Sequence, residues 1–404
     1  MSFGEVPRDT RNVVIGAAPL AAGLGFYQVA IAVFLPLEGI SVTNLGVLFT
    51  TLGLTTVALS IPFAILSDRY GRKEIMLVGS VLGSIVIVVP GLTSNFLLLE
   101  ASAVIGGAGE AMYLATRNAY LADTTTVSVR AETFSLSFMT FTIASGIGTF
   151  LPAFFPLFKI DLLTAHKITF VALGLFALIT AFTVQKWAVK ARPNVSREGI
   201  LPRKSFGVIM KFSAANLLIG LGAGLIIPLI PTWFYLRFNE TDVFSGPLIA
   251  SSNIIMGLTA VAAPRVARSI GLVKGIVMTQ ALSTIFLLAI PFCPTALIAG
   301  VFYVIRAVLM NMASPLSDTF LMNMIAEDER AIASSFNVVL WNLPNAASTV
   351  VGGSMLSSGN LSLPFYLCGG LYVTAIVAFY AIFRRTEKTV QSSGASPSSV
   401  NDYT

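Results

Sequence analysis

The sequence predicts an all-α integral membrane protein with twelve transmembrane helices, arranged as two six-helix pseudo-symmetric bundles. Three observations predict this fold class. Only 11% of the 404 residues are charged and 55% are hydrophobic, whereas soluble domains carry about 25% charged residues. Long apolar runs recur along the whole chain. The two halves of the chain also echo each other in their pattern of hydropathy.

Twelve runs are long and apolar enough to cross a bilayer, which takes roughly 20 mostly apolar residues. They are continuous and do not alternate with a period of two, which argues against a membrane β-barrel. The first run is too long for the core of a signal peptide and has no clear cleavage site, so we expect it to be a span. The predicted spans are Asn12–Leu37, Leu45–Leu66, Ile75–Thr93, Phe96–Leu121, Thr133–Phe158, Ile168–Ala188, Phe206–Phe234, Phe244–Ala263, Leu272–Phe292, Thr295–Met322, Ala331–Leu356 and Leu363–Phe383.

Lysine and arginine are unevenly distributed between the two sides of this topology. If the N-terminus lies in the cytoplasm and the spans alternate, the outside receives Lys159, Lys167 and Arg237, and Arg306 lies inside a helix. The remaining 21 of the 25 lysines and arginines then fall on the cytoplasmic side. Cytoplasmic loops carry such an excess of cations. We therefore expect a multi-pass protein of the plasma membrane with both termini in the cytoplasm.

The net charge of +6 follows from this topology. Nucleic-acid binding would need a basic folded face, and the loops are too short to build one. Cys293 and Cys368 both fall toward the outer side, where we expect two buried thiols rather than a disulfide. His166, the one histidine, lies at the outer start of the sixth span and carries no signal of a site.

The halves of the chain align when the sequence is shifted against itself. Gly71 then meets Gly271, Arg130 meets Arg330, and the apolar runs on either side coincide. Two six-helix halves in the same orientation are a plan of secondary transporters, with the site near the midplane between them. The predicted domains are a cytoplasmic N-terminus (1–11), a first bundle (12–188), a cytoplasmic linker (189–205), a second bundle (206–385) and a disordered, Ser-rich cytoplasmic tail (386–404).

Charge gathers in one short turn between the second and third spans, AILSDRYGRKEIM at residues 64–76. This stretch resembles the signature of the same loop in the major facilitator superfamily, roughly G-x-L-A-D-R-x-G-R-K. It departs from the pattern at Ala64 and Ser67. The stretch RNAYLADTTTVSVRAETFS, residues 117–135, is similar to the loop between the fourth and fifth spans of that family. The residues that match the signature are Leu66, Asp68, Arg69, Gly71, Arg72 and Lys73.

The resemblance implies roles for this turn. Asp68 ends the second span, where the helix dipole disfavours an acid unless a cation or another helix start faces it. Arg130 and the helix start near Ala331 are the candidate partners, and family members are thought to latch their halves together in this way. Gly71 permits the tight reversal. Arg69, Arg72 and Lys73 hold the loop in the cytoplasm and can meet anionic lipid heads, a role that topology alone would also explain.

The chain also resembles the twelve-helix drug:proton antiporter branch, with two departures. The stretch SGIGTFLPAFFP has Gly146, Gly148 and two prolines but lacks the Gly-Pro pair of that branch. Ser102 or Ala103 stands where the branch carries an arginine in its fourth helix.

Two charges fall at membrane depth, where ionisable residues mark pathways by default. Glu110 lies near the middle of the fourth span and Arg306 near the middle of the tenth. The resemblance places the first, fourth, seventh and tenth spans around a central cavity. We expect Glu110 to carry the proton and Arg306 to set its charge state. A purely structural pair is the alternative.

Weaker polar candidates for the cavity are scattered over several spans. A buried polar residue is as often a hydrogen-bonding link between helices as a ligand. The glycines of the seventh span, followed by Pro228 and Pro231, predict either a bend or close helix packing. The candidates are Tyr27, Gln28, Tyr113, Asn216, Tyr303, Asn311, Asn337 and Trp341.

The sequence favours a transporter over an enzyme. It carries no Walker A run, no His/Cys metal spacing and no sign of a cofactor. We expect a monomer that binds a small-molecule substrate, protons and membrane lipids and moves an organic solute by alternating access. Proton-coupled efflux of amphipathic compounds is the first choice. Proton-coupled uptake of a small organic anion, with Arg306 as the charge clamp, and a transporter-like receptor or lipid flippase are the alternatives.

Overall fold

The computed structural model describes residues 6–189, 205–259, 271–325 and 330–393. Every regular element within these ranges is an α-helix or a 3-10 helix. Ten helices in this part of the chain are long and apolar enough to cross a membrane. Such continuous helices satisfy their own backbone hydrogen bonds, which lipid cannot do for them.

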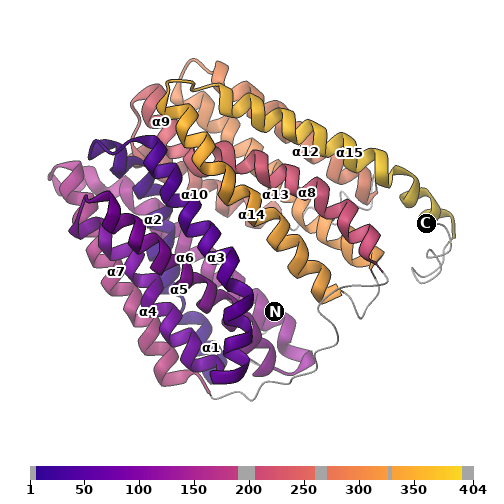
Figure 1. The fold of residues 1–404 in the computed structure, drawn as a ribbon, viewed down its shortest axis with the longest axis horizontal. Coiled ribbons are helices and arrows are strands. Elements are labelled where there is room, and N and C mark those ends of the chain that lie inside the picture. The colour runs from indigo at the N-terminus through magenta and orange to yellow at the C-terminus, as the bar shows by residue number, and fades with distance from the viewer. Residues whose placement is uncertain (1–5, 190–204, 260–270, 326–329, 394–404) are drawn as a thin grey trace. The chain divides into compact units, whose positions relative to one another are not determined.

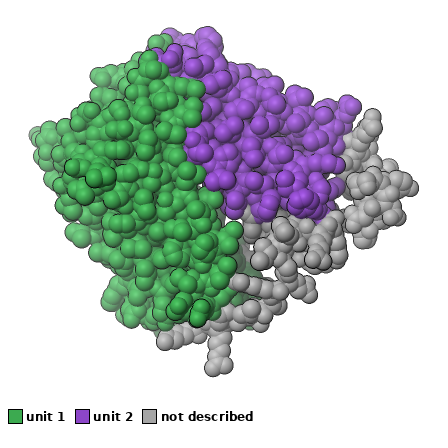
Figure 2. All heavy atoms as spheres, in the orientation of Figure 1, with its two compact units in different colours: residues 1–196, 228–250, 349–358 green, residues 197–227, 251–348, 359–404 purple. Residues whose placement is uncertain are grey.

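The chain forms two compact units (Figure 2). Unit 1 comprises residues 1–196, 228–250 and 349–358, and unit 2 comprises residues 197–227, 251–348 and 359–404. Unit 1 therefore includes short pieces of the second half of the sequence as well as the whole of the first bundle.

Seven helices and one 3-10 segment from the first half of the chain build most of unit 1 (Figure 1). The elements are α1 (Arg8–Ile15), α2 (Ala18–Leu37), α3 (Val42–Tyr70), α4 (Arg72–Leu92), α5 (Phe96–Asp123), α6 (Val127–Phe150), η2 (Leu151–Phe158) and α7 (Leu162–Trp187).

Glycines let α4 and α5 pack at backbone contact in the middle of unit 1. A Cβ atom added to Gly109 would lie 2.4 Å from the backbone nitrogen of Gly83. A Cβ atom added to Gly79 would lie 2.7 Å from the backbone nitrogen of Tyr113. Small residues bring membrane helices close in this way because dispersion contacts, rather than hydrophobic burial, hold them together in lipid.

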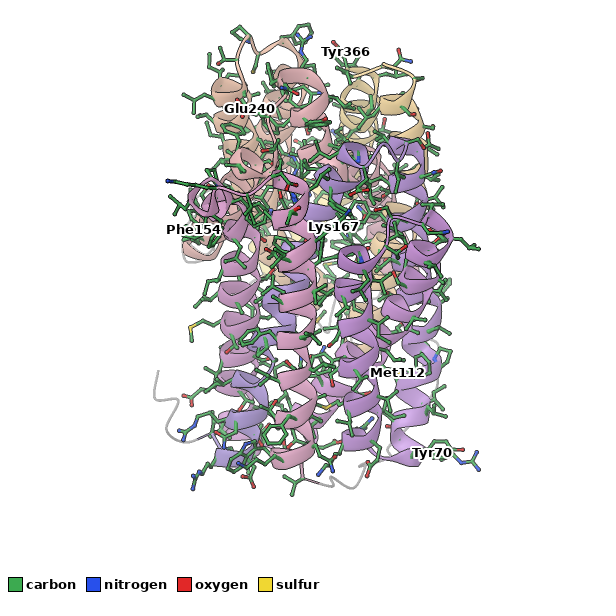
Figure 3. The ribbon with its side chains drawn as sticks, turned by 90° about the vertical axis from the view of Figure 1, so that its left-hand side faces the viewer. Tyr70, Met112, Phe154, Lys167, Glu240 and Tyr366 are labelled. Atoms are coloured by element: carbon green, nitrogen blue, oxygen red, sulfur yellow. The ribbon has the colours of Figure 1, made fainter. Side chains whose placement is uncertain are left out.

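The two ends of unit 1 are told apart by their polar residues. Ser94 donates to Glu38 at 2.7 Å, and Lys167 forms a 2.7 Å ion pair with the same carboxylate. We call this end the distal side. The opposite end, which carries Gly71 and the turn between α5 and α6, is the proximal side. Figure 3 shows Lys167 and Phe154 far from Tyr70, which lies at the proximal end.

The seventh predicted span is broken into α8 (Phe206–Ile226), the 3-10 segment η3 (Ile227–Leu229) and α9 (Ile230–Phe238). Pro228 and Pro231 lie at the break, as the sequence predicts, because proline lacks the amide donor that a continuous helix needs. Close packing, the other prediction for this span, is also present: a Cβ atom on Gly224 would lie 1.9 Å from the carbonyl oxygen of Asn345.

The remaining elements complete the second half of the chain. They are α10 (Asp242–Thr259), α12 (Leu272–Ala289), η4 (Ile290–Phe292), α13 (Ala296–Met324), α14 (Arg330–Ser357) and α15 (Leu363–Ser393). A core of aromatic rings, packed mostly edge-to-face, joins α8, α13 and α15 in unit 2, built on Phe212, Phe320, Phe379 and Phe383.

The internal repeat is visible in the backbone. Gly71 has φ +109° and precedes α4, and Gly271 has φ +89° and precedes α12. This region of φ favours glycine, which explains why both copies of the turn use it. The last helix runs to Ser393, past Arg385, where the predicted second bundle ends. The predicted linker between the bundles and residues 394–404 of the predicted tail lie outside the described residues, apart from residues at the linker's ends.

Candidate functional site

A small pocket lies within unit 1 between α2, α4, α5 and α6. Most of its walls are apolar, and three glycines keep the α4–α5 wall thin. Two polar side chains, Glu110 and Tyr113, reach it from α5. The lining residues are Ala17, Leu20, Ala21, Leu24, Gly79, Gly83, Gly109, Glu110, Tyr113, Leu114 and Phe141.

Glu110 lies at the middle of α5, which has 28 residues. Thr56 Oγ1, on α3, lies 3.4 Å from its Oε2 atom. The same hydroxyl lies 2.9 Å from the carbonyl oxygen of Leu52 and 3.2 Å from that of Gly107. A hydroxyl has one proton to donate. The hydrogen bond to Glu110 is therefore long and shared with two competing acceptors.

Glu100 is a second acid in the same helix, which the sequence analysis missed. Thr51, on α3, donates a hydrogen bond to its Oε1 atom. The Oε2 atom is buried and has no hydrogen-bond partner among the described residues. Glu100 is the fifth residue of α5 and so looks like an interfacial residue in the sequence. The sequence analysis named only Glu110 among the acids of this span, so Glu100 adds to its set of candidates.

Arg117 also lies in α5, two helical turns from Glu110 on the proximal side. Its guanidinium lies over the rings of Tyr113, at 6.0 Å, and Phe141, at 5.8 Å. Both Nε and Nη1 of Arg117, and the hydroxyl of Tyr113, are buried without a hydrogen-bond partner among the described residues. The sequence analysis counted Arg117 among the lysines and arginines of the cytoplasmic side, and that count does not set Arg117 apart from the others.

Arg306 is 4% exposed and lies in α13 of unit 2. Its Nη2 atom donates to the hydroxyl of Tyr372, on α15, at 2.8 Å, and its Nε atom has no hydrogen-bond partner among the described residues. Arg306 and Glu110 lie in different units, so the predicted meeting of the two side chains stays a prediction. Within the described part of unit 2, the Arg306 cation has the neutral Tyr372 as its partner and forms no ion pair.

The other polar candidates differ in burial. Tyr27 is buried in α2 with its ring edge-to-face against Phe170, and Tyr303 is buried in α13. Gln28 and Asn311 are exposed, and Asn311 donates back to the carbonyl oxygen of Ala307 within its own helix. A side chain satisfied by its own helix is available to a ligand only if that bond breaks.

Asn216 and Asn337 meet in unit 2. The amide of Asn216, on α8, donates to Oδ1 of Asn337, on α14, at 2.7 Å. Trp341 follows Asn337 by one helical turn in α14. A Cβ atom added to Gly220 would lie 2.3 Å from the carbonyl oxygen of Trp341. Two turns beyond Asn337, Asn345 donates to the carbonyl oxygen of Gly220 at 3.3 Å. This part of α14 thus packs on α8, as the predicted alternative of a hydrogen-bonding link between helices requires.

The charged turn of the family signature is a folded network on the proximal side. Arg72 is 9% exposed, and its Nη1 atom lies 2.5 Å from Asp68 Oδ1 and 2.6 Å from the hydroxyl of Ser67. Its Nε atom donates to Asp123 at 3.0 Å. The turn therefore ties α3 and α4 to the end of α5. Asp123 lies in the second quoted stretch, yet its role was not predicted.

The remaining residues of the predicted latch have other surroundings. Arg69 lies over the ring of its neighbour Tyr70, at 5.7 Å, and Lys73 is half-buried. Arg130 donates to the carbonyl oxygens of Ala122 at 3.0 Å and Thr125 at 3.4 Å, which closes the turn between α5 and α6. The helix start near Ala331 belongs to unit 2, so its predicted meeting with Asp68 stays a prediction.

Cys293 and Cys368 are buried free thiols in unit 2, which confirms the prediction. His166 carries no signal of a site in the sequence, and the structure places it within α7. Its side chain is fully buried against Asp242, the first residue of α10. The two residues lie far apart in the sequence, so no local pattern could have revealed the pair.

Comparison with solved structures shows the same fold. The nucleoside transporter NupG aligns with a TM-score of 0.76 over 94% of this chain and 100% of its own, at 13% identity. A bacterial homologue of the human lysosomal transporter Spinster, inward-facing and occupied, aligns with a TM-score of 0.73 over 95% of this chain and 98% of its own, at 16% identity. The human organic anion transporter MFSD10 (TETRAN) aligns with a TM-score of 0.64 over 92% of this chain and 100% of its own, at 15% identity.

At these identities the likeness shows the fold alone, which is the twelve-helix architecture that the sequence predicts. No curated protein matches the chain. The family model described as Major Facilitator Superfamily matches residues 13–349 and 212–400, which together cover most of the chain. The chain is therefore a multi-pass membrane transporter of small molecules, and it belongs to the Major Facilitator Superfamily.

Proposed function

We propose that the chain is a secondary active transporter that exports amphipathic organic compounds in exchange for protons. Glu110 is the observation that carries the proposal. Its carboxyl group lines a pocket at the middle of α5, and its one hydrogen bond among the described residues is the long contact with Thr56. An ionisable group at membrane depth marks a proton or substrate pathway by default.

The walls of the pocket support an amphipathic substrate. Leu20, Leu24, Leu114 and Phe141 offer apolar surface. The carboxyl group of Glu110 is the polar group beside them. A ligand site of this kind takes most of its affinity from apolar contact and its orientation from a few polar groups. A cationic or neutral amphipathic compound could compete with the proton at Glu110, and exchange of the two follows from that competition.

The proposed orientation places the proximal side in the cytoplasm of a cell whose plasma membrane holds the protein. The cations of the charged turn support this, because cytoplasmic loops carry an excess of lysine and arginine. Arg69 and Lys73 would meet anionic lipid heads there. Asp68 would latch the proximal side when that side is closed, with Arg130 or the helix start near Ala331 as its partner.

The experiment is reconstitution of wild type, Glu110→Gln and Glu100→Gln in proteoliposomes with a panel of fluorescent amphipathic dyes. We expect Glu110→Gln to bind dye as wild type does and to lose the pH dependence of transport. Glu100→Gln is the matched control, since it makes the same change ten residues earlier in the same helix. Normal pH-dependent exchange by Glu110→Gln would show that the proton is carried elsewhere.

Uptake of a small organic anion is the second candidate function. Two arginines favour it, the half-buried Arg117 and the buried Arg306, because neither forms an ion pair with a carboxylate among the described residues. Arg306, with Tyr372 beside it, would clamp the anion. This function predicts accumulation of a carboxylate substrate that Arg306→Ala abolishes, and it predicts no transport of cationic dyes.

A further inference from the structure

The one histidine of the chain forms a closed contact with an acid from the other half of the sequence. His166 lies in the first turns of α7, and Asp242 begins α10; both side chains are 0% exposed. Nε2 of His166 lies 2.7 Å from Oδ2 of Asp242. Nδ1 of His166 lies 2.7 Å from the carbonyl oxygen of Leu162. Both residues belong to unit 1, on its distal side.

Aromatic rings surround the imidazole. The rings of Phe26, Phe34, Phe155 and Phe170 have their centroids 5.0–6.5 Å from that of His166. Oδ1 of Asp242 is buried and has no hydrogen-bond partner among the described residues. The pair is therefore shut off from water, in surroundings where a charge or a missing hydrogen bond is costly.

Few charged groups of the neighbouring elements share the distal end with this pair. Lys167 and Glu38 pair with each other next to it. Lys159 and Asp161 cap η2 and α7 and are exposed, and Arg237 in the last turn of α9 is exposed as well. Glu240, two residues before Asp242, is half-buried, and its backbone amide donates to the carbonyl oxygen of Phe234. The described charged residues of α1 and α4, which also pack on α7, lie in their first turns on the proximal side. Asp242 is thus the acid that contacts the imidazole of His166 directly.

The geometry fixes how many protons the closed pair holds. A carbonyl oxygen only accepts, so Nδ1 must donate to Leu162 and carries one proton. Nε2 then faces a carboxyl oxygen at 2.7 Å. Two bare acceptors would repel each other at this distance, so a second proton lies between them. It belongs either to an imidazolium facing a carboxylate or to a carboxylic acid facing a neutral imidazole, and the total is the same.

Several other contacts within unit 1 join the two halves of the sequence. Thr232, on α9, donates to the carbonyl oxygen of Ala32 at 2.6 Å. The backbone amide of Val350, on α14, donates to the hydroxyl of Thr50 at 3.1 Å. A Cβ atom on Gly246, in α10, would lie 2.5 Å from the carbonyl oxygen of Thr149. In each contact a piece of the second half of the sequence is held by the first half.

We propose that His166 and Asp242 form a proton-binding site that holds the distal side of the transporter closed. Closure traps one proton between Nε2 and Oδ2, and opening separates the two side chains into water. This site is distinct from Glu110, and the inference stands whichever solute the protein carries and in whichever direction. It uses only the alternating access that comes with the family.

The sign of the pH dependence follows from counting protons. In water a histidine loses its charge near pH 6.5 and an aspartate keeps its negative charge above about pH 4. Between these values the open pair holds as many protons as the closed pair, so pH has no effect. Above about pH 6.5 opening releases one proton, and the ratio of open to closed protein rises up to tenfold per pH unit. Acid on the distal side therefore keeps it closed.

The experiment measures how readily the distal side opens, and it needs no substrate. Ser245 is fully buried in α10, one turn from Asp242, and Ser245→Cys is a nearly isosteric reporter. The native Cys293 and Cys368 are replaced by serine, and the protein is held in nanodiscs. The rate of maleimide labelling is measured from pH 5.5 to 8.5. Each rate is divided by that of Ile160→Cys, an exposed position on the same side, which corrects for the chemistry of the thiol.

We expect labelling at position 245 to be constant below about pH 6.5 and to rise above it. His166→Gln should remove this dependence. Asp242→Asn is the sharper variant, because its amide can donate to Nε2 of a neutral histidine and make the same contact without the trapped proton. Asp242→Asn should stay slow to label at every pH, including pH 8.5.

Two results would overturn the inference. One is wild-type labelling that does not change with pH after correction. The other is Asp242→Asn labelling faster than wild type at pH 8.5, which would mean that the negative charge of Asp242, and not the number of protons that the pair holds, keeps this side closed. Asp242→Asn keeps the size and hydrogen bonding of the acid, so the test does not depend on whether His166→Gln folds.

Discussion

Arg72 Nε lies 3.0 Å from Asp123 Oδ2 and joins the start of α4 to the end of α5. The same guanidinium holds Asp68 and Ser67 at the end of α3. The charge that crowds into this turn therefore has a folding role, since one nearly buried arginine ties three helix ends together. A planar guanidinium can make such a fork of bonds, and a lysine ammonium cannot.

Replacing Arg72 by lysine should destabilise the protein by about 2 kcal/mol, because charged hydrogen bonds to Asp123 and Ser67 are lost. The measurement is thermal unfolding in detergent. Lys73→Ala is the control in the next residue, which is half-buried and outside this network, and it should unfold close to wild type. Equal stability of Arg72→Lys and wild type would show that the network contributes nothing.

Asp68→Asn should lower the rate of transport with little loss of folded protein. Arg72 keeps its contact with Asp123 in this variant, so the turn stays folded, while the proposed latch of the proximal side is lost. The check is turnover in proteoliposomes together with the yield and unfolding temperature of the purified variant. Turnover equal to that of wild type would rule out the latch.

Gly109→Ala should cost about 1–3 kcal/mol of stability and narrow the pocket beside Glu110. The added Cβ atom would meet the backbone of Gly83 at 2.4 Å, and backbone cannot move aside as a flexible side chain can. Gly146→Ala is the matched control, since a Cβ atom there meets nothing within 4 Å. The two unfolding temperatures should therefore differ clearly, and equal values would contradict the packing described for α4 and α5.

The ion pair of Glu38 with Lys167 should make a pH-dependent contribution to stability. Hydrogen bonds from Lys167 and Ser94 lower the pKa of the Glu38 carboxyl group in the folded protein. A lowered pKa stabilises the fold above the unfolded value of about 4.3, and this stabilisation is lost as the pH falls through the folded value.

Glu38→Gln should accordingly unfold at a lower temperature than wild type at pH 7, and the difference should vanish in acid. Unfolding scans of both proteins between pH 3 and 7 measure this. The Lys167 side chain is 41% exposed, so added salt should shrink the difference at pH 7 as well. A difference that is constant over the whole pH range would contradict the assignment.

The helices could be predicted because lipid offers the backbone no hydrogen-bond partners. A run of about 20 apolar residues must close its own hydrogen bonds, and a helix does so wherever it lies. The break at Ile227–Leu229 follows from the prolines around it, and the turn at Gly71 from the charges that keep it in water. Each of these features depends on neighbours in the sequence.

The candidate site could be predicted only in part. Glu110 was predicted because an ionisable residue in the middle of an apolar run marks a pathway by default. Glu100 was not, since an acid near a helix end is usually interfacial, and only the contact with Thr51 on α3 places it inside the bundle. The contact between His166 and Asp242 depends on packing between distant segments, which one sequence does not reveal.

The central claim is that uphill export of an amphipathic compound is driven by protons. The most direct test loads proteoliposomes with a fluorescent amphipathic dye at equal concentration on both sides and then imposes a pH gradient. We predict net movement of the dye toward the acidic side for wild type and Glu100→Gln, and none for Glu110→Gln. Dye that stays at equal concentration with wild-type protein, or that moves equally well with Glu110→Gln, would contradict the account.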